Sequence, residues 1–124
     1  MAVSPDARIH PSAVIEPGAT IGAGAVVGPF SLIGPEVVLA AGVHVRSHAV
    51  VTGWTDIGAE TMIFSFATVG EVPQDLKFRG ERSRLIVGAR CRIREGATLN
   101  TGTEGGGDQQ GGGGPEVEGH GRRG

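Results

Sequence analysis

The stretch from residue 9 to residue 69 reads IHPSAVIEPGATIGAGAVVGPFSLIGPEVVLAAGVHVRSHAVVTGWTDIGAETMIFSFATV, with an aliphatic residue at every sixth position. These positions are Ile9, Ile15, Ile21, Val27, Ile33, Leu39, Val45, Val51, Ile57, Ile63 and Val69, and the same phase resumes at Val87, Ile93 and Leu99. A helix period of 3.6 or a strand period of 2 does not produce a strict six. A hexapeptide repeat is the signature of a parallel β-helix, so we expect an all-β solenoid.

The other positions of the hexad support the same fold. If the aliphatic residue is counted as first, the fifth position is mostly small or β-branched, as expected in a narrow interior. Prolines occupy the third position at Pro11, Pro17, Pro29 and Pro35, where no ladder hydrogen bond is required. Glycine recurs at the second position, which we interpret as a corner that needs an unusual backbone conformation.

Composition limits the classes of function. The chain has 124 residues, a net charge of −2 and one cysteine, Cys91. One domain, no intramolecular disulfide and a reducing compartment are the expectation. The small negative net charge does not favour nucleic-acid binding. No apolar run reaches the roughly 18 residues of a membrane span. Residues 1–9 lack the features of a secretory signal. A cytoplasmic protein without an integral membrane segment is therefore expected.

Three histidines and one tryptophan invite a functional interpretation. His10, His44 and His48 occupy the second, sixth and fourth places of their hexads, so no common face is implied and no metal site is expected. Trp54 is fourth in its hexad and is expected to face outward, either against a neighbouring subunit or as a plain surface aromatic residue.

The repeat is interrupted after Val69. Residues 71–81 read EVPQDLKFRGE, and the phase returns only at Val87. We expect an excursion loop at residues 72–86 that leaves the solenoid and returns in register. A loop on a rigid scaffold often carries binding or catalytic residues, and the alternative is an insertion without function.

These residues carry a family resemblance. The hexads resemble those of the hexapeptide-repeat acyltransferases, which implies a left-handed helix with three hexads per coil, or between four and five coils here. The segment VGEVPQDLKFRGE at 69–81, with RIRE at 92–95 and NTGT at 100–103, is similar to the pattern of the UDP-N-acetylglucosamine O-acyltransferases. This resemblance covers residues 8–107. It implies transfer of a 3-hydroxyacyl chain from acyl carrier protein to the sugar 3-hydroxyl, the first step of lipid A biosynthesis.

The resemblance also implies site residues and partners. Gln74, Asp75 and Lys77 would contact UDP-N-acetylglucosamine at a cleft between subunits of a homotrimer, and no cofactor is involved. The family's general base is a histidine in an Ala-His-x-Ala-His-Asp context that these residues do not contain, so no catalytic residue is assigned and the chain alone is expected to be inactive. Another hexapeptide-repeat acyltransferase, or a non-catalytic β-helical scaffold, remains the alternative.

Basic residues concentrate between positions 77 and 94. This stretch holds seven of the eleven lysines and arginines: Lys77, Arg79, Arg82, Arg84, Arg90, Arg92 and Arg94. An acidic carrier protein would be attracted to such a region, so the six arginines are candidate carrier contacts. The alternative is a solvated face that acids elsewhere balance.

The periodicity ends before residue 105. Residues 1–104 are expected to form the β-helix, and half of residues 105–124 are glycine, which predicts a disordered tail. The codons for GDQQGG at 107–112, read one nucleotide later, permit VTNRVG, which resembles the family's next hexad. We therefore hypothesise a single-nucleotide shift near codon 107. A coding sequence that lacks such a repeat in the neighbouring frame would exclude it.

Overall fold

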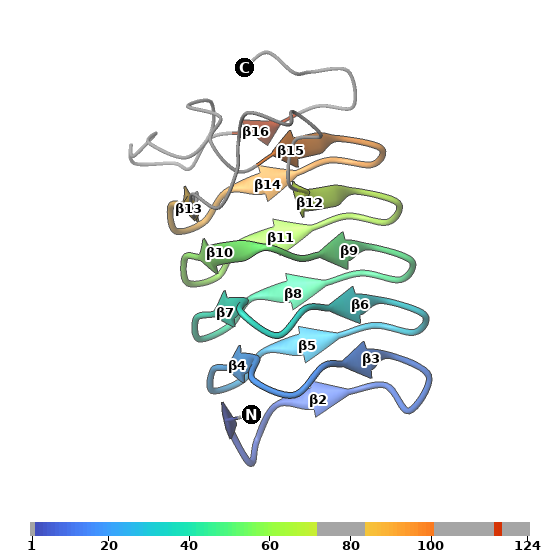
Figure 1. Cartoon of the computed structure of the whole chain (residues 1–124), viewed down its shortest axis with the longest axis vertical. Coiled ribbons are helices and arrows are strands. Elements are labelled where there is room, and N and C mark those ends of the chain that lie inside the picture. The colour runs from blue at the N-terminus through green and yellow to red at the C-terminus, as the bar shows by residue number, and fades with distance from the viewer. Residues whose placement is uncertain (1, 72–83, 101–115, 118–124) are drawn as a thin grey trace, which may run out of the picture.

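The computed structural model is a left-handed parallel β-helix, in which short strands alternate with turns (Figure 1). It describes residues 2–71, 84–100 and 116–117. The strands form three parallel sheets, which we call A, B and C. None of the described residues forms a helix, and hence none forms one long and apolar enough to cross a membrane.

Each sheet takes every third strand of the chain as far as β15, and β16 then joins sheet B beside β14. Sheet A contains β1 (Ala2–Val3), β4 (Thr20–Ile21), β7 (Val38–Leu39), β10 (Trp54–Ile57) and β13 (Arg84–Val87). Sheet B contains β2 (Arg8–Ile9), β5 (Val26–Val27), β8 (His44–Val45), β11 (Met62–Ile63), β14 (Arg92–Ile93) and β16 (Glu116–Val117). Sheet C contains β3 (Val14–Ile15), β6 (Leu32–Ile33), β9 (Val50–Val51), β12 (Thr68–Glu71) and β15 (Thr98–Asn100).

The register confirms three hexads per coil. Ile21 pairs with Leu39 on the next strand of sheet A, and Val27 pairs with Val45 on sheet B, each eighteen residues further along. Stacked coils therefore align identical hexad positions, and each aliphatic residue lies above its equivalent in the coil below. The solenoid stability is then a sum over neighbouring coils.

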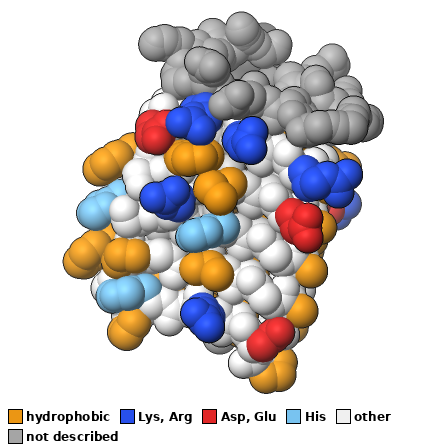
Figure 2. Space-filling view, turned by 180° about the vertical axis from the view of Figure 1, so that it is seen from behind, with side chains coloured by type: hydrophobic (Ala, Val, Ile, Leu, Met, Phe, Trp, Pro, Cys, Tyr) orange, Lys and Arg blue, Asp and Glu red, His pale blue; other side chains and the backbone are white. Residues whose placement is uncertain are grey.

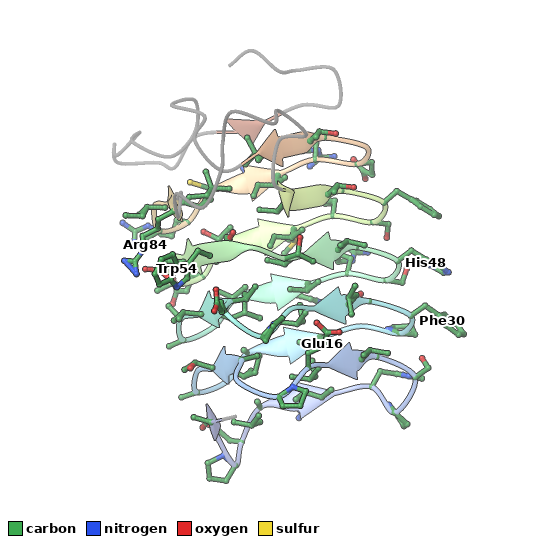
Figure 3. The ribbon with its side chains drawn as sticks, viewed as in Figure 1. Glu16, Phe30, His48, Trp54 and Arg84 are labelled. Carbon is green, nitrogen blue, oxygen red and sulfur yellow. The ribbon has the colours of Figure 1, made fainter. Side chains whose placement is uncertain are left out.

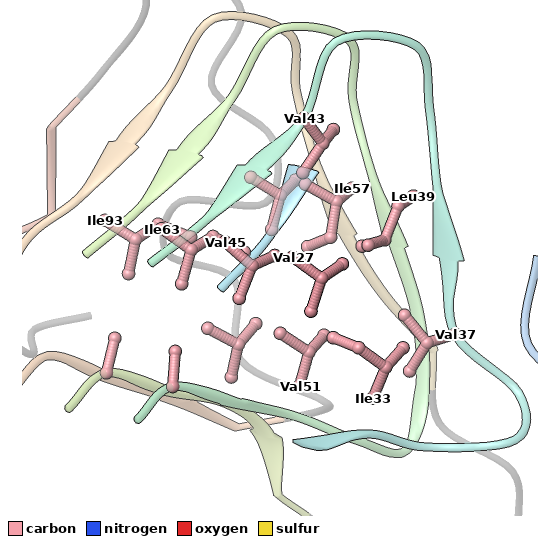
Figure 4. Packing of buried hydrophobic residues seen from close by; sticks show 14 of the residues in the cluster. Val27, Ile33, Val37, Leu39, Val43, Val45, Val51, Ile57, Ile63 and Ile93 are labelled. Atoms are coloured by element: carbon pink, nitrogen blue, oxygen red, sulfur yellow. The ribbon is translucent and has the colours of Figure 1, made fainter. Parts of the chain in front are cut away.

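The interior is the predicted aliphatic column. From Ile21 onward, every first-position residue is at most 3% exposed, while Ile9 and Ile15 are partly buried because they belong to the first coil. The fifth-position residues share this core, and Ala19, Val37 and Ala49 are fully buried. Figure 4 shows Val37 and Val43 of this position beside the first-position residues. Alternation of a large and a small side chain fills the narrow prism.

The structure corrects our interpretation of the second-position glycines. Among the second-position glycines only Gly70 has a positive φ. The regular corners lie instead at the fourth position, where Phe30, His48 and Phe66 have φ of 60°, 61° and 66°. Glycine is required at the second position because the next coil is close. A Cβ added to Gly58 would lie 2.5 Å from the carbonyl carbon of Gly88.

The chain returns to the solenoid in register after the interruption, because Ile57 pairs with Val87. Residues 72–83 lie outside the described residues. β13 begins at Arg84, within the range predicted for the loop, because β10 extends back to Trp54 and pairs with it over four residues. The hexad pattern marks buried positions only and so could not indicate this extension.

The predicted tail at 105–124 lies outside the described residues except for Glu116–Val117. These two residues form β16, which pairs with β14 at Arg92 and Ile93.

Thr61 joins the coils below and above the interruption. Its hydroxyl donates to the Gly88 carbonyl at 2.9 Å and accepts from the Cys91 N–H at 3.1 Å. Thr61 is fully buried, so Thr61→Val would leave two buried backbone groups without these partners. We expect a loss of about 2–4 kcal/mol of unfolding free energy, measured by urea denaturation. Thr20→Val, on the outer face of β4, should change stability by less than about 0.5 kcal/mol; equal losses would contradict this.

Candidate functional site

The predicted substrate contacts Gln74, Asp75 and Lys77 lie outside the described residues, as do Arg79 and Arg82. The structure does describe where this segment leaves and rejoins the solenoid. It leaves at the end of β12 on sheet C and rejoins at the start of β13 on sheet A. The segment is thus attached at both ends to paired strands of the upper coils.

Gly70 determines how the chain leaves sheet C. Its φ is 90°, and the ladder between β12 and β15 shifts register between Val69 and Glu71. An added Cβ would overlap the Thr52 carbonyl oxygen and the Thr55 hydroxyl, which themselves form a 2.8 Å hydrogen bond. Only glycine permits this bulge directly before the candidate substrate segment.

Arg84 lies where the segment rejoins sheet A. Its guanidinium carbon is 5.4 Å from the centre of the Trp54 ring, and its Nη1 is 3.7 Å from an Asp56 carboxylate oxygen (Figure 3). Trp54 therefore contacts the strand that follows the segment. Both partners of the ion pair are more than a third exposed, so the pair contributes little to stability.

The described arginines of the basic stretch do not form one surface. Arg84 points outward from sheet A, Arg90 lies at the corner between β13 and β14 with φ of 57°, and Arg92 lies on sheet B. Arg94 follows β14 and contacts Glu95, with Nε 3.4 Å from the carboxylate. The four predicted carrier contacts that the structure describes are thus divided between two faces and the corner that joins them.

The sequence analysis missed two residues that lie beside these arginines. The Phe64 ring has the Arg94 guanidinium at 4.0 Å and the Arg46 guanidinium at 5.6 Å from its centre. Arg46 and Phe64 belong to earlier coils and precede the basic stretch in sequence. Arg46, Phe64 and Arg94 all hold the second position of their hexads, with spacings of eighteen and, across the interruption, thirty residues. Comparison of hexads on one face would have found them.

The histidines do not share a site. His48 stacks between Phe30 and Phe66 at the corner between sheets B and C, with ring centres 5.2 Å and 5.1 Å apart (Figure 3). His44 lies on sheet B, where burial and the neighbouring Arg46 charge lower its pKa. Within the described ranges, no three His, Cys, Asp or Glu side chains gather as they would around a metal ion.

Cys91 is 2% exposed and packs in the core at the fifth hexad position. Burial raises the pKa of its thiol, an effect that hydrogen bonds with Thr61 and Gly88 partly offset. The unfolded chain therefore loses this proton first, and the thiol's contribution to stability is lost as pH rises above about 8.5. We expect Cys91→Ala to flatten the decline of stability between about pH 8 and 10, measured by urea denaturation. An unchanged slope would contradict the assignment.

The fold and the repeat together define the class. Residues 3–35 match the family model described as bacterial transferase hexapeptide (six repeats). The chain is also similar to a solved UDP-N-acetylglucosamine acyltransferase, with 44% identity and a TM-score of 0.73 over 79% of this chain and 38% of that one. The chain is therefore a hexapeptide-repeat protein of the left-handed β-helix class.

Curated relatives narrow the similarity within this class. The acyl-[acyl-carrier-protein]–UDP-N-acetylglucosamine O-acyltransferase of Rhizobium johnstonii is 57% identical over 67 residues, which are 54% of this chain and 25% of the relative. The enzyme of the same name from Paracoccus denitrificans is 72% identical over 46 residues, 37% of this chain and 18% of the relative. The chain thus spans a quarter or less of these relatives, and it is similar to their N-terminal part.

Proposed function

We propose that these residues belong to an enzyme that transfers a 3-hydroxyacyl chain from acyl carrier protein to the 3-hydroxyl of UDP-N-acetylglucosamine, the first step of lipid A biosynthesis. The observation that carries the proposal is that two independent comparisons, one of the sequence and one of the fold, both find UDP-N-acetylglucosamine acyltransferases. The relative from Rhizobium johnstonii is named for this donor and acceptor, and a solved acyltransferase with 44% identity has the same solenoid.

In this proposal the segment at 72–83 binds the acceptor. The Asp75 carboxylate accepts a hydrogen bond from a sugar hydroxyl, and Gln74 contacts the sugar beside it. Lys77 offsets the charge of the diphosphate. The Gly70 bulge and the pairing of β13 with β10 hold both ends of the segment. These contacts would orient the 3-hydroxyl for reaction.

The reaction joins the sugar oxygen to the acyl carbonyl carbon and breaks the thioester C–S bond. A general base takes the hydroxyl proton, and the carrier thiol leaves with a proton. The resemblance assigns the base to a histidine in the sequence Ala-His-x-Ala-His-Asp, which these 124 residues do not contain. By themselves they are therefore expected to show no turnover.

The proposed assembly is a homotrimer in the cytoplasm, with weak association of these residues alone. Arg79, Arg82, Arg84, Arg90, Arg92 and Arg94 are the proposed contacts to the acidic carrier protein. Sedimentation velocity at several concentrations tests the assembly. A sharp trimer that does not change with concentration would contradict weak association.

The test of the function is a chimera that joins residues 1–100 to the remainder of the Paracoccus denitrificans relative. We expect this chimera to transfer 3-hydroxyacyl groups from acyl carrier protein and to be inactive with acetyl-coenzyme A. The unmodified relative, assayed in parallel, is the control. A folded chimera that uses only acetyl-coenzyme A would indicate another hexapeptide-repeat acyltransferase, and one that uses neither donor would favour a scaffold.

A further inference from the structure

One short stretch of the chain, residues 52–57, contacts both ends of the interruption. Before the interruption, the Thr52 N–H donates to the Val69 carbonyl at 2.9 Å, and the Thr52 carbonyl lies against Gly70. After the interruption, β13 pairs with β10 over four residues, whereas every strand before β10 has only two. The solenoid is thus reinforced in the coil that the interruption adjoins.

Gly53 allows Trp54 to belong to β10 rather than to the corner before it. At the same corner two coils below, the residue with positive φ is Gly18, at the fourth hexad position. Next to Trp54 it is instead Gly53, at the third position, with φ of 72°. The turn therefore ends one residue earlier, and Trp54 extends the strand. This extension supplies the partner with which Arg84 pairs in the ladder.

Three side chains of β10 and β13 share the outer face of sheet A. Thr55 and Leu85 point into the core, so Trp54, Asp56 and Arg84 point away from it. The Arg84 guanidinium carbon is 5.4 Å from the centre of the Trp54 ring, and its Nη1 is 3.7 Å from an Asp56 carboxylate oxygen. Figure 3 shows Trp54 and Arg84 side by side at this end of β10. Two contacts from one strand therefore restrict the first described residue after the interruption.

These contacts, rather than charge, distinguish Arg84 from the other basic residues. Figure 2 shows Lys and Arg side chains at separate places over the upper half of one face of the solenoid. An exposed ion pair or cation–π contact adds little to stability. It does restrict the side chain to one rotamer and its backbone to one position on the neighbouring strand. Such precision matters for binding, because binding groups must be held within about 0.5 Å of their productive positions.

We propose that Trp54 is a positioning residue for the binding of the sugar nucleotide. It acts through Arg84, because the indole and the Asp56 carboxylate hold this side chain and so fix where the chain rejoins the solenoid. The inference rests on the proposed function, which assigns acceptor binding to the residues just before Arg84. It also gives Arg84 a role that differs from a carrier contact, since its loss then weakens binding of the acceptor rather than of the carrier.

Titration calorimetry of the acyltransferase chimera with UDP-N-acetylglucosamine tests this role. We expect Trp54→Leu to weaken binding about 3- to 10-fold, the factor that corresponds to the loss of one cation–π contact. Trp54→Phe keeps an aromatic face for Arg84 and should stay within about twofold of the parent. Phe30→Leu is the matched control, because Phe30 is an exposed aromatic residue at another corner and its loss should change the affinity less than about twofold.

Steady-state kinetics separate positioning from general damage. In Trp54→Leu the KM for UDP-N-acetylglucosamine should rise by the same factor, whereas kcat and the KM for the carrier donor should stay within about twofold of the parent. In an Arg84→Met background, Trp54→Leu should have no further effect, because both variants remove the same contact. A rise of both KM values, or dissociation of the chimera in sedimentation velocity, would overturn the proposal, since Trp54 would then act on the fold or on a neighbouring subunit.

Hydrogen exchange in the 124-residue chain measures the contact without catalysis. Trp54→Leu should speed exchange of the β13 amides about 3- to 10-fold and leave that of the β14 amides within about twofold. Unchanged exchange at β13 would contradict the proposal. A chimera that transfers no acyl group but binds the sugar nucleotide in a Trp54-dependent way would support this inference and refute the proposed function. An active chimera whose acceptor affinity does not depend on Trp54 would do the reverse.

Discussion

Gly70→Ala is expected to destabilise the protein by about 3–5 kcal/mol, the largest effect of any single methyl group considered. Two costs add. Gly70 has φ of 90°, which L-residues resist, and its added Cβ would overlap the Thr52 carbonyl oxygen and the Thr55 hydroxyl. Both neighbours are held by a hydrogen bond to each other, so neither can move without losing it. Urea denaturation followed by circular dichroism measures the loss.

Two other glycines separate the backbone cost from the overlap. Gly24 and Gly96 have φ of 70° and 74°, and an added Cβ would meet nothing within 4 Å at either position. Gly24→Ala and Gly96→Ala should therefore cost only about 1–2 kcal/mol. If Gly70→Ala is no worse than these two, the close packing of Gly70 against Thr52 and Thr55 does not exist in solution.

Asp75→Ala in the acyltransferase chimera is expected to lower kcat/KM about 10- to 150-fold. This factor corresponds to the free energy lost when a hydrogen bond to a charged group is removed. The proposed role is to accept a hydrogen bond from the sugar, which alanine cannot do. Asp75→Asn keeps an acceptor of the same shape and should retain more activity than Asp75→Ala. Steady-state kinetics with varied UDP-N-acetylglucosamine provides the measurement.

The control for this variant is Asp6→Ala. Asp6, in the first coil, accepts hydrogen bonds from Ser4 and Gly24. It lies toward the opposite end of the solenoid from β12 and β13, the strands that flank residues 72–83 (Figure 1). Its loss should leave kcat/KM within about twofold of the parent, as expected of a surface change. If Asp75→Ala behaves like Asp6→Ala, the acceptor is bound elsewhere and the substrate assignment is wrong.

The core could be predicted from the sequence because the same hexad position is buried in coil after coil. Every coil buries the same position, so an aliphatic residue at Ile21, Leu39 or Ile57 has the same physical reason to be there. The period therefore remains recognisable even where a single hexad departs from the pattern. The left hand followed from the resemblance, because a period of six is compatible with either hand.

Corner geometry could not be predicted in the same way. Phe30, His48 and Phe66 adopt positive φ although none is glycine, and they stack on one another across three coils. Glu60 and Arg90 adopt it at the same hexad position. The second-position glycines looked like corner residues, and the spacing of coils that requires them is a contact between segments eighteen or more residues apart. Such contacts have no local signal in the chain.

The candidate site was partly predictable for a related reason. Arg92 and Arg94 belong to a local run of arginines, whereas Arg46 and Phe64 approach Arg94 only through the stacking of coils. Gln74, Asp75 and Lys77 rest on the family resemblance and stay a prediction. The sequence concentrates basic residues between positions 77 and 94, and the solenoid distributes the four arginines that the structure describes over two faces and a corner.

The most direct test of the central claim is the identity of the bond that the acyltransferase chimera makes. The chimera would be incubated with a 3-hydroxyacyl carrier protein and UDP-N-acetylglucosamine, and the product analysed by mass spectrometry and two-dimensional NMR. The account predicts an ester at the sugar 3-hydroxyl, with loss of the free thioester. An acyl group at any other position, or none while the parent relative reacts, would contradict the claim that residues 1–100 supply the acceptor site of this enzyme.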